Sequence, residues 1–152
     1  MSKRNNEYES ESDYKKVLSK DGVKDIDGTL IKNNICKSSD YLKIANSNSW
    51  ANRIIYNERF SATLICQKPG ESNRTHYHTD EDEWWVILKG KIKWWIQDLG
   101  EVLAEKGDII FVPRTKQHKI KTIGNENSIR LAICRPDIEH IHPEKDVVPE
   151  NF

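Results

Sequence analysis

Residues 70–90 read GESNRTHYHTDEDEWWVILKG, and they contain the most informative pattern of the chain. His76 and His78 are separated by one residue, so in an extended strand both imidazoles project to the same side. The polar residues 79–82 are typical of a turn, and a reversal there brings the chain back so that Glu83 lies beside the histidines. The stretch therefore predicts a hairpin that carries metal-binding side chains on one face.

Short apolar runs separated by turn residues continue on both sides of this hairpin, from Gly28 to Cys134. Such spacing favours many short strands over helices. Strands are expected at residues 29–35, 52–56, 59–67, 74–78, 83–88, 91–96, 102–103, 109–112, 118–122 and 129–134, with one or two helical turns at 38–45. Short strands in this number have to close or stack to cover their edges, so we expect an all-β jelly-roll barrel.

The chain has 152 residues, which fits a single domain. Residues 1–25 are dense in charged and small polar side chains, so we expect a polar, mobile N-terminal arm or a short frayed helix. Residues 26–136 are expected to form the barrel. Residues 137–152 contain several prolines and predict an extended C-terminal tail that lies against the barrel or a partner subunit.

Charge and cysteine usage exclude several classes of protein. Lys plus Arg and Asp plus Glu both number 24, so no net charge attracts the chain to nucleic acid or to an anionic membrane. The first residues contain no apolar signal region, and no apolar run is long enough to cross a bilayer, so we expect a cytoplasmic protein. The widely spaced Cys36, Cys66 and Cys134 predict neither a disulfide framework nor a thiolate zinc site.

A fourth candidate ligand, His118, follows a second turn-forming segment, PRTKQ at residues 113–117. Only the fold could bring it to the hairpin. Imidazole nitrogens together with one carboxylate oxygen suit a borderline divalent metal ion. Another H-x-H pair, His140 and His142, lies in the tail without a hairpin to organise it, so we expect surface histidines there.

The hairpin resembles the first motif of the cupin superfamily, G-x5-H-x-H-x4-E-x6-G. Every position of that motif is present at the required spacing, as Gly70, His76, His78, Glu83 and Gly90. The second cupin motif, G-x5-P-x-G-x2-H-x3-N, is matched at Gly107, Pro113 and His118. Thr115 stands in place of its glycine and Thr122 in place of its asparagine. Because threonine tolerates positive φ poorly, we expect the turn before His118 to differ in shape from the usual one.

The resemblance covers about residues 60–136 and implies a double-stranded β-helix that is often dimeric, so a homodimer is expected. Carried over residue by residue, it implies that the ligands of one divalent metal ion per chain are His76, His78, Glu83 and His118. Fe(II) is the favoured ion, and Mn, Ni, Co or Zn accepts the same ligand set.

Strand parity predicts the wall of a substrate pocket around these ligands. The residues that share a face with a predicted ligand are Arg74, Trp85, Ile87 and Thr122. By the same parity, Trp84 and Trp95 point outward while Trp94 points inward. An anionic substrate could also meet Arg53, Arg59 or Arg114, because arginine binds a carboxylate through two parallel hydrogen bonds.

A ligand set of this kind, in a fold that leaves coordination positions open, predicts a metal-dependent enzyme acting on a small organic substrate. Fe(II)-type dioxygenase chemistry is the leading expectation. One alternative is a lyase or isomerase that uses the metal as a Lewis acid, but some metal-dependent cupin lyases place a tyrosine base where this chain has Trp85. A second alternative is a non-catalytic cupin module. In each case the expected partner is a small molecule, with anions among the candidates.

Overall fold

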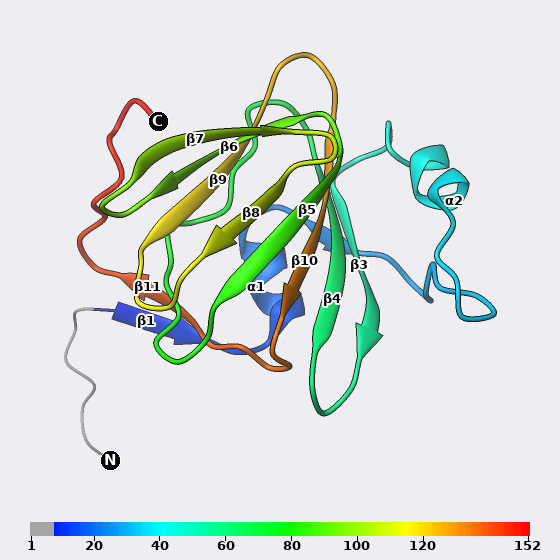
Figure 1. The fold of residues 1–152 in the computed structure, drawn as a ribbon, viewed down its shortest axis with the longest axis horizontal. Coiled ribbons are helices and arrows are strands. Elements are labelled where there is room, and N and C mark those ends of the chain that lie inside the picture. The colour runs from blue at the N-terminus through cyan, green and yellow to red at the C-terminus, as the bar shows by residue number, and fades with distance from the viewer. Residues whose placement is uncertain (1–7) are drawn as a thin grey trace.

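The computed structural model describes residues 8–152, which form mainly β-strands (Figure 1). In chain order the elements are β1 (Tyr8–Glu11), α1 (Tyr14–Lys20), β2 (Lys24–Asp25), α2 (Ser38–Lys43), β3 (Trp50–Tyr56), β4 (Ser61–Gln67), β5 (Glu83–Lys89), β6 (Lys91–Ile96), β7 (Gly100–Glu105), β8 (Ile109–Val112), β9 (His118–Ile123), β10 (Ser128–Cys134) and β11 (His140–Pro143). A six-stranded sheet has the order β2-β3-β4-β10-β5-β8, and a three-stranded sheet has the order β7-β6-β9. Strands β1 and β11 form a small separate sheet.

The main core lies between the six-stranded and three-stranded sheets. Strand β6 alternates in burial, so Ile92 and Trp94 point into the core. Strand β5 directs Trp85 and Ile87 into the same cluster from the other sheet. Because one apolar cluster joins residues of both sheets, the predicted all-β jelly roll is confirmed.

The two tryptophan pairs are divided as strand parity predicts. In β5, Trp85 is 2% exposed whereas Trp84 is 39% exposed. In β6, Trp94 is completely buried and Trp95 is only partly buried. One tryptophan of each pair therefore packs in the core, and the other lies on the outer surface of its sheet.

Two of the expected strands are absent from the described structure. Residues 29–35 contain a tight turn, in which Asn33 and Asn34 have φ values of 51° and 64° and Lys32 pairs with Ile35. Asparagine adopts this left-handed conformation more readily than most residues, so the apolar run is folded back before it can extend. Residues 74–78 form isolated bridges at His76 and Tyr77 instead of a continuous strand. These bridges join His76 to His118 and Tyr77 to Ile141, and β5 pairs with β8 and β10, so the predicted hairpin with the strand at Glu83 is not formed.

The N-terminal segment packs on the barrel instead of extending from it. Helix α1 begins after Asp13, whose carboxylate accepts hydrogen bonds from the Lys15 and Lys16 amides, and it buries Val17 and Leu18. The part of the predicted mobile arm that spans residues 8–25 is thus a strand, a helix and a strand. Residues 1–7 lie outside the described range. Neither helix in residues 8–152 has the length and apolar character that crossing a membrane requires.

The C-terminal segment lies against the barrel and includes the extended strand β11. Strand β11 pairs with β1, so segments near the two ends of the chain lie side by side (Figure 1). On its way past the barrel, Ile141 exchanges two backbone hydrogen bonds with Tyr77, each 3.0 Å long. The tail is thereby fixed directly against the His76–His78 segment.

The expectation that the turn before His118 departs from the usual shape is wrong. Thr115 has φ of 69°, the left-handed conformation that a glycine would adopt at this position. Its amide donates a 2.6 Å hydrogen bond to the carbonyl oxygen of His78, which holds the turn against the His76–His78 segment. A threonine in this conformation costs about 1–2 kcal/mol, so the surrounding contacts impose the turn against the preference of the residue.

Candidate metal centre

Segments distant in the sequence bring the predicted ligands together. Glu83 is the first residue of β5 and His118 the first residue of β9. His76 pairs with His118 through backbone hydrogen bonds of 2.9 and 3.2 Å. The donor atoms that His76, His78, Glu83 and His118 offer all lie within 4.8 Å of one another, and these residues are buried. The predicted set therefore converges on one point.

Each of the three histidines has its Nδ1 atom next to a backbone carbonyl oxygen. The distances are 3.0 Å from His76 to Arg74, 2.7 Å from His78 to Glu139 and 3.0 Å from His118 to Lys116. A carbonyl oxygen can only accept, so we assign the proton of each ring to Nδ1. The Nε2 lone pairs of His76 and His118 are then free to bind a metal, whereas Nε2 of His78 lies 2.8 Å from the Glu83 carboxylate, where a metal ion would replace the shared proton.

Unpaired nitrogens in the interior support the same conclusion. The Nε2 atoms of His76 and His118 are buried, and among residues 8–152 neither has a hydrogen-bond partner. A buried polar atom without a partner is costly, and a metal ion would provide the missing interaction. The residues present therefore fit a divalent ion.

Electrostatics keep His76 and His118 neutral. Burial, followed by the charge of His118, lowers the pKa of His76 well below its usual value. Burial, followed by the charge of His78, lowers the pKa of His118 to about 4. Imidazole must be deprotonated at the ligating nitrogen to bind a metal, so both rings are in the correct form at neutral pH.

Glu83 and His78 form the charged pair of the centre. Their Oε2 and Nε2 atoms are 2.8 Å apart. Burial alone would raise the pKa of Glu83, but the hydrogen bond and charge of His78 outweigh it and lower that pKa. Burial would lower the pKa of His78, but the hydrogen bond and charge of Glu83 outweigh it and raise that pKa. Glu83 is therefore an anionic carboxylate, as a metal ligand must be.

The side of the centre toward the barrel core is apolar. The ring of Trp85 lies 5.7 Å from that of His118 and 5.6 Å from that of Trp94, measured between centroids. Both tryptophans are almost completely buried. They exclude water from this side, so any open coordination position faces away from them.

His140, which was not predicted as a site residue, lies beside the metal centre. The centroid of its ring is 4.7 Å from that of His76 and 4.8 Å from that of His78. Burial lowers its pKa to about 3, and its Nδ1 is buried without a hydrogen-bond partner in the described chain. His142 is also partly buried, with its Nδ1 3.1 Å from the carbonyl oxygen of Thr75. The expectation of surface histidines is therefore wrong; the H-x-H spacing was the available signal.

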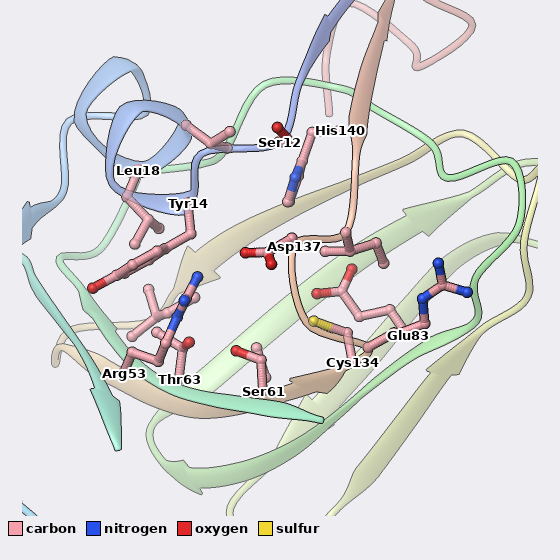
Figure 2. Close-up of a pocket in the computed structure, with 15 residues that line it drawn as sticks. Ser12, Tyr14, Leu18, Arg53, Ser61, Thr63, Glu83, Cys134, Asp137 and His140 are labelled. Atoms are coloured by element: carbon pink, nitrogen blue, oxygen red, sulfur yellow. The ribbon is translucent and has the colours of Figure 1, made fainter. Parts of the chain in front are cut away.

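A cavity of about 60 Å³ reaches the centre on the side of Glu83 and His140 (Figure 2). The four side chains that strand parity predicted for a substrate pocket do not line this cavity. Trp85 and Ile87 belong to the main core. Arg74 instead forms ion pairs with Glu11 and Asp21, and the Thr122 hydroxyl pairs with that of Ser128. The wall includes Arg53, which the sequence offered as one of several candidate cations, and Tyr14 of α1.

Comparison with known proteins agrees with this architecture. A family model described as the cupin domain matches residues 63–134. The tetracenomycin polyketide synthase protein TcmJ of Streptomyces glaucescens is 30% identical over 81 residues, which are 50% of this chain and 54% of that protein. The chain thus spans about half the length of this curated relative.

Solved structures extend the likeness of the fold. An uncharacterized Klebsiella pneumoniae protein with a double-stranded β-helix domain superposes with a TM-score of 0.62 at 15% identity, covering 76% of this chain and 94% of that one. A predicted oxalate decarboxylase from Thermotoga maritima superposes with a TM-score of 0.52 at 23% identity, covering 57% of this chain and 78% of that one. At these identities the likeness concerns the fold alone.

Proposed function

We propose that this chain is a metal-dependent enzyme of the cupin superfamily that acts on a small organic substrate, because the cupin domain model matches residues 63–134. One divalent ion per chain would be held by His76, His78, Glu83 and His118. The observation that carries the proposal is the shared arrangement of the three imidazoles: each Nδ1 is held by a carbonyl oxygen, and the Nε2 atoms converge on the Glu83 carboxylate.

We further propose Fe(II)-type dioxygenase chemistry as the reaction class. Three nitrogen donors and one carboxylate suit Fe(II), as well as Mn, Ni, Co and Zn, and Fe(II) would supply an electrophilic, redox-capable centre with positions open to small molecules. The protein contributes the remaining features of the site. Glu83 provides negative charge, Trp85 excludes water from the core side, and the cavity beside His140 gives access from the other.

A lyase or isomerase that uses the metal as a Lewis acid would employ the same centre and the same cavity. A mechanism that needs a tyrosine base at position 85 is disfavoured, because the Trp85 ring is buried against Trp94 and carries no acidic hydroxyl. TcmJ is described as a polyketide synthase protein, which supports an enzymatic over a purely ligand-binding role for its relatives.

Oxygen consumption is the measurement that separates these reaction classes. Protein loaded with Fe(II) under anaerobic conditions is mixed with each of a panel of small organic acids, and oxygen uptake is followed after air is admitted. The proposal predicts substrate-dependent uptake that disappears in the His76→Ala/His118→Ala double variant and persists in His142→Ala. Product formation without oxygen uptake would indicate a lyase or isomerase instead of a dioxygenase. Ligand binding without turnover would indicate a non-catalytic binding module instead of an enzyme.

We also propose that the protein is a homodimer. Trp84 of β5 and Phe111 of the edge strand β8 are register partners, and they are 39% and 56% exposed. Together with Ile109, which is 66% exposed, they form an apolar surface of the kind that associates with another chain. Sedimentation equilibrium of the native chain and of Phe111→Asp tests this, because a dimer formed through this surface becomes monomeric in the variant.

A further inference from the structure

The cavity at the metal centre is enclosed by both ends of the chain as well as by the barrel. Its wall includes Tyr14, Val17 and Leu18 of α1, and Asp137 and Ile138 from the segment before β11. Strands β3, β4 and β10 supply Arg53, Thr63 and Ala132, while Glu83 and His140 lie where the cavity meets the centre (Figure 2). The cavity is thus a formed compartment with one end at the metal ligands.

Arg53 is held in this wall by two aromatic rings. Its Cζ atom lies 3.7 Å from the ring centroid of Tyr14 and 4.3 Å from that of Tyr56. The hydroxyl of Tyr14 donates to Asp25, and the hydroxyl of Tyr56 donates to Asp137, so both rings are themselves fixed. Contacts of this kind position a guanidinium group without neutralising its charge.

The Arg53 guanidinium contacts Tyr14 and Tyr56, but no carboxylate of residues 8–152 forms an ion pair with it. Its Nε atom is buried without a hydrogen-bond partner, and within residues 8–152 the side chain forms no ion pair with a carboxylate. The other arginine of the wall, Arg135, is paired with Glu81 at 2.5 Å. A buried donor of a charged group without an acceptor is costly, which indicates an anionic ligand in its place.

The acidic residues of the wall are already engaged. Asp137 accepts the 2.7 Å hydrogen bond from Tyr56, and Glu83 is bound to His78 at the metal centre. Most of the remaining lining is apolar, with Val17, Leu18, Ile65, Ala132 and Ile138. Within residues 8–152, the cavity therefore has one arginine without a carboxylate partner, an apolar middle and an end that faces the metal ligands.

The volume limits the size of the ligand. A cavity of about 60 Å³ is far below the ~300–1,000 Å³ of sites for drug-sized molecules. It exceeds the ~10–15 Å³ that a single water requires, so it holds a molecule with only a few non-hydrogen atoms. A sugar or an aromatic substrate does not fit.

We propose that this cavity binds a short-chain organic acid, with its carboxylate on Arg53 and its other end directed to Glu83 and His140. The proposal rests on the proposed function, because the metal centre forms the reactive end of the cavity. Arg53 selects the carboxylate by a charge-assisted hydrogen bond, and the apolar middle selects a short carbon chain.

Binding of acetate, propionate and lactate, each compared with its uncharged amide, tests the proposal by isothermal titration calorimetry. In the metal-loaded protein the acids are expected to bind at least about tenfold more tightly than the amides. Arg53→Gln should remove this preference, and Arg53→Lys should retain part of it. Arg59→Gln is the matched control, because the Arg59 side chain is 82% exposed outside the cavity wall.

The proposal would be overturned if the acids bound the native protein and Arg53→Gln with equal affinity. It would also be overturned if no heat of acid binding were detected at the highest acid concentration that can be titrated. Metal content and melting temperature measured on the same samples confirm that Arg53→Gln remains folded and loaded.

The titrations are repeated on His76→Ala/His118→Ala. If native protein contains no metal but still binds acids through Arg53, the metal-dependent function fails while the acid site stands. If metal binds and the acids do not, the acid site fails alone.

Discussion

The Nδ1 atom of His78 lies 2.7 Å from the backbone carbonyl oxygen of Glu139, so the C-terminal segment directly orients a predicted metal ligand. The backbone pairing of Ile141 with Tyr77 fixes this contact. In the same segment, His140 reaches the rings of His76 and His78. The tail is therefore part of the site as well as a cover for the barrel.

Truncation tests this role of the tail. Removal of residues 137–152 eliminates the hydrogen bond to His78, and we expect metal affinity to fall by about 10–100-fold, the usual cost of losing such a partner. Truncation after Glu144 keeps β11 and should keep the affinity within about threefold. A competition assay with a fluorescent chelator measures both, with circular dichroism to check the fold. Equal affinities for the two truncated proteins would show that the tail does not orient His78.

The ion pairs of Glu11 predict how stability depends on pH. Burial alone would raise the pKa of Glu11, but its hydrogen bonds and charge interactions with Lys20 and Arg74 outweigh it and lower the pKa to about 2. A carboxyl whose pKa is lower when folded stabilises the protein above its unfolded pKa, and this contribution is lost as pH falls toward the folded pKa. Urea denaturation should show stability declining between about pH 4.5 and pH 2.

Glu11→Gln should lose about 1–3 kcal/mol at pH 7 and have a shallower decline in that acidic range, because its amide cannot form the ion pairs. Glu58→Gln is the matched control, since the Glu58 side chain is 83% exposed. Identical slopes for Glu11→Gln and the native protein between pH 4.5 and pH 2 would contradict the assignment.

Thr115 predicts a stabilising substitution. With φ of 69°, the residue is strained, and its side chain is exposed, so Thr115→Gly relieves strain without losing packing. We expect a gain of about 1 kcal/mol in the free energy of unfolding. Arg114→Gly, at a neighbouring residue without positive φ, should instead lose stability. A loss in Thr115→Gly comparable to that in Arg114→Gly would mean that the turn is not strained.

Substitution of Gly90 is expected to lower the free energy of unfolding. A Cβ atom at this position would lie 2.9 Å from the backbone carbonyl oxygen of Asn127 and from the Cα of Ser128, and φ is 75°. Gly100 also has positive φ, at 90°, but nothing lies within 4 Å of its Cβ position. Gly100→Ala should cost about 1–2 kcal/mol, and Gly90→Ala a further ~1–3 kcal/mol from the backbone clash. Thermal unfolding compares them; equal losses would refute the close approach at Gly90.

Local sequence patterns predicted the parts of the fold and site that depend on neighbouring residues. Strand alternation and a polar turn predicted that His76, His78 and Glu83 lie together, and the structure places these side chains together. The predicted hairpin is not formed, because His76 pairs with His118 instead of with β5. The inward positions of Trp85 and Trp94 follow from the same alternation. His118 was recoverable only through the second motif, because no local pattern connects residue 118 to residue 76.

The remaining features depend on contacts between distant segments. His140 reaches the centre because β11 pairs with β1 and Ile141 pairs with Tyr77, and neither pairing has a local signature. Arg74 has the predicted parity, but Glu11 and Asp21 from the N-terminal segment bind its guanidinium and hold it away from the cavity. The cavity wall combines α1, the barrel and the tail, so alternation along single strands could not identify it.

Elemental analysis tests whether one divalent metal ion is held by His76, His78, Glu83 and His118. The protein is purified without added metal and without chelating resins, alongside His76→Ala/His118→Ala and the control His142→Ala, and each is assayed by inductively coupled plasma mass spectrometry. We predict close to one transition-metal ion per chain in the native protein and in His142→Ala, and almost none in the double variant. Stoichiometric metal retained by the double variant would contradict the account.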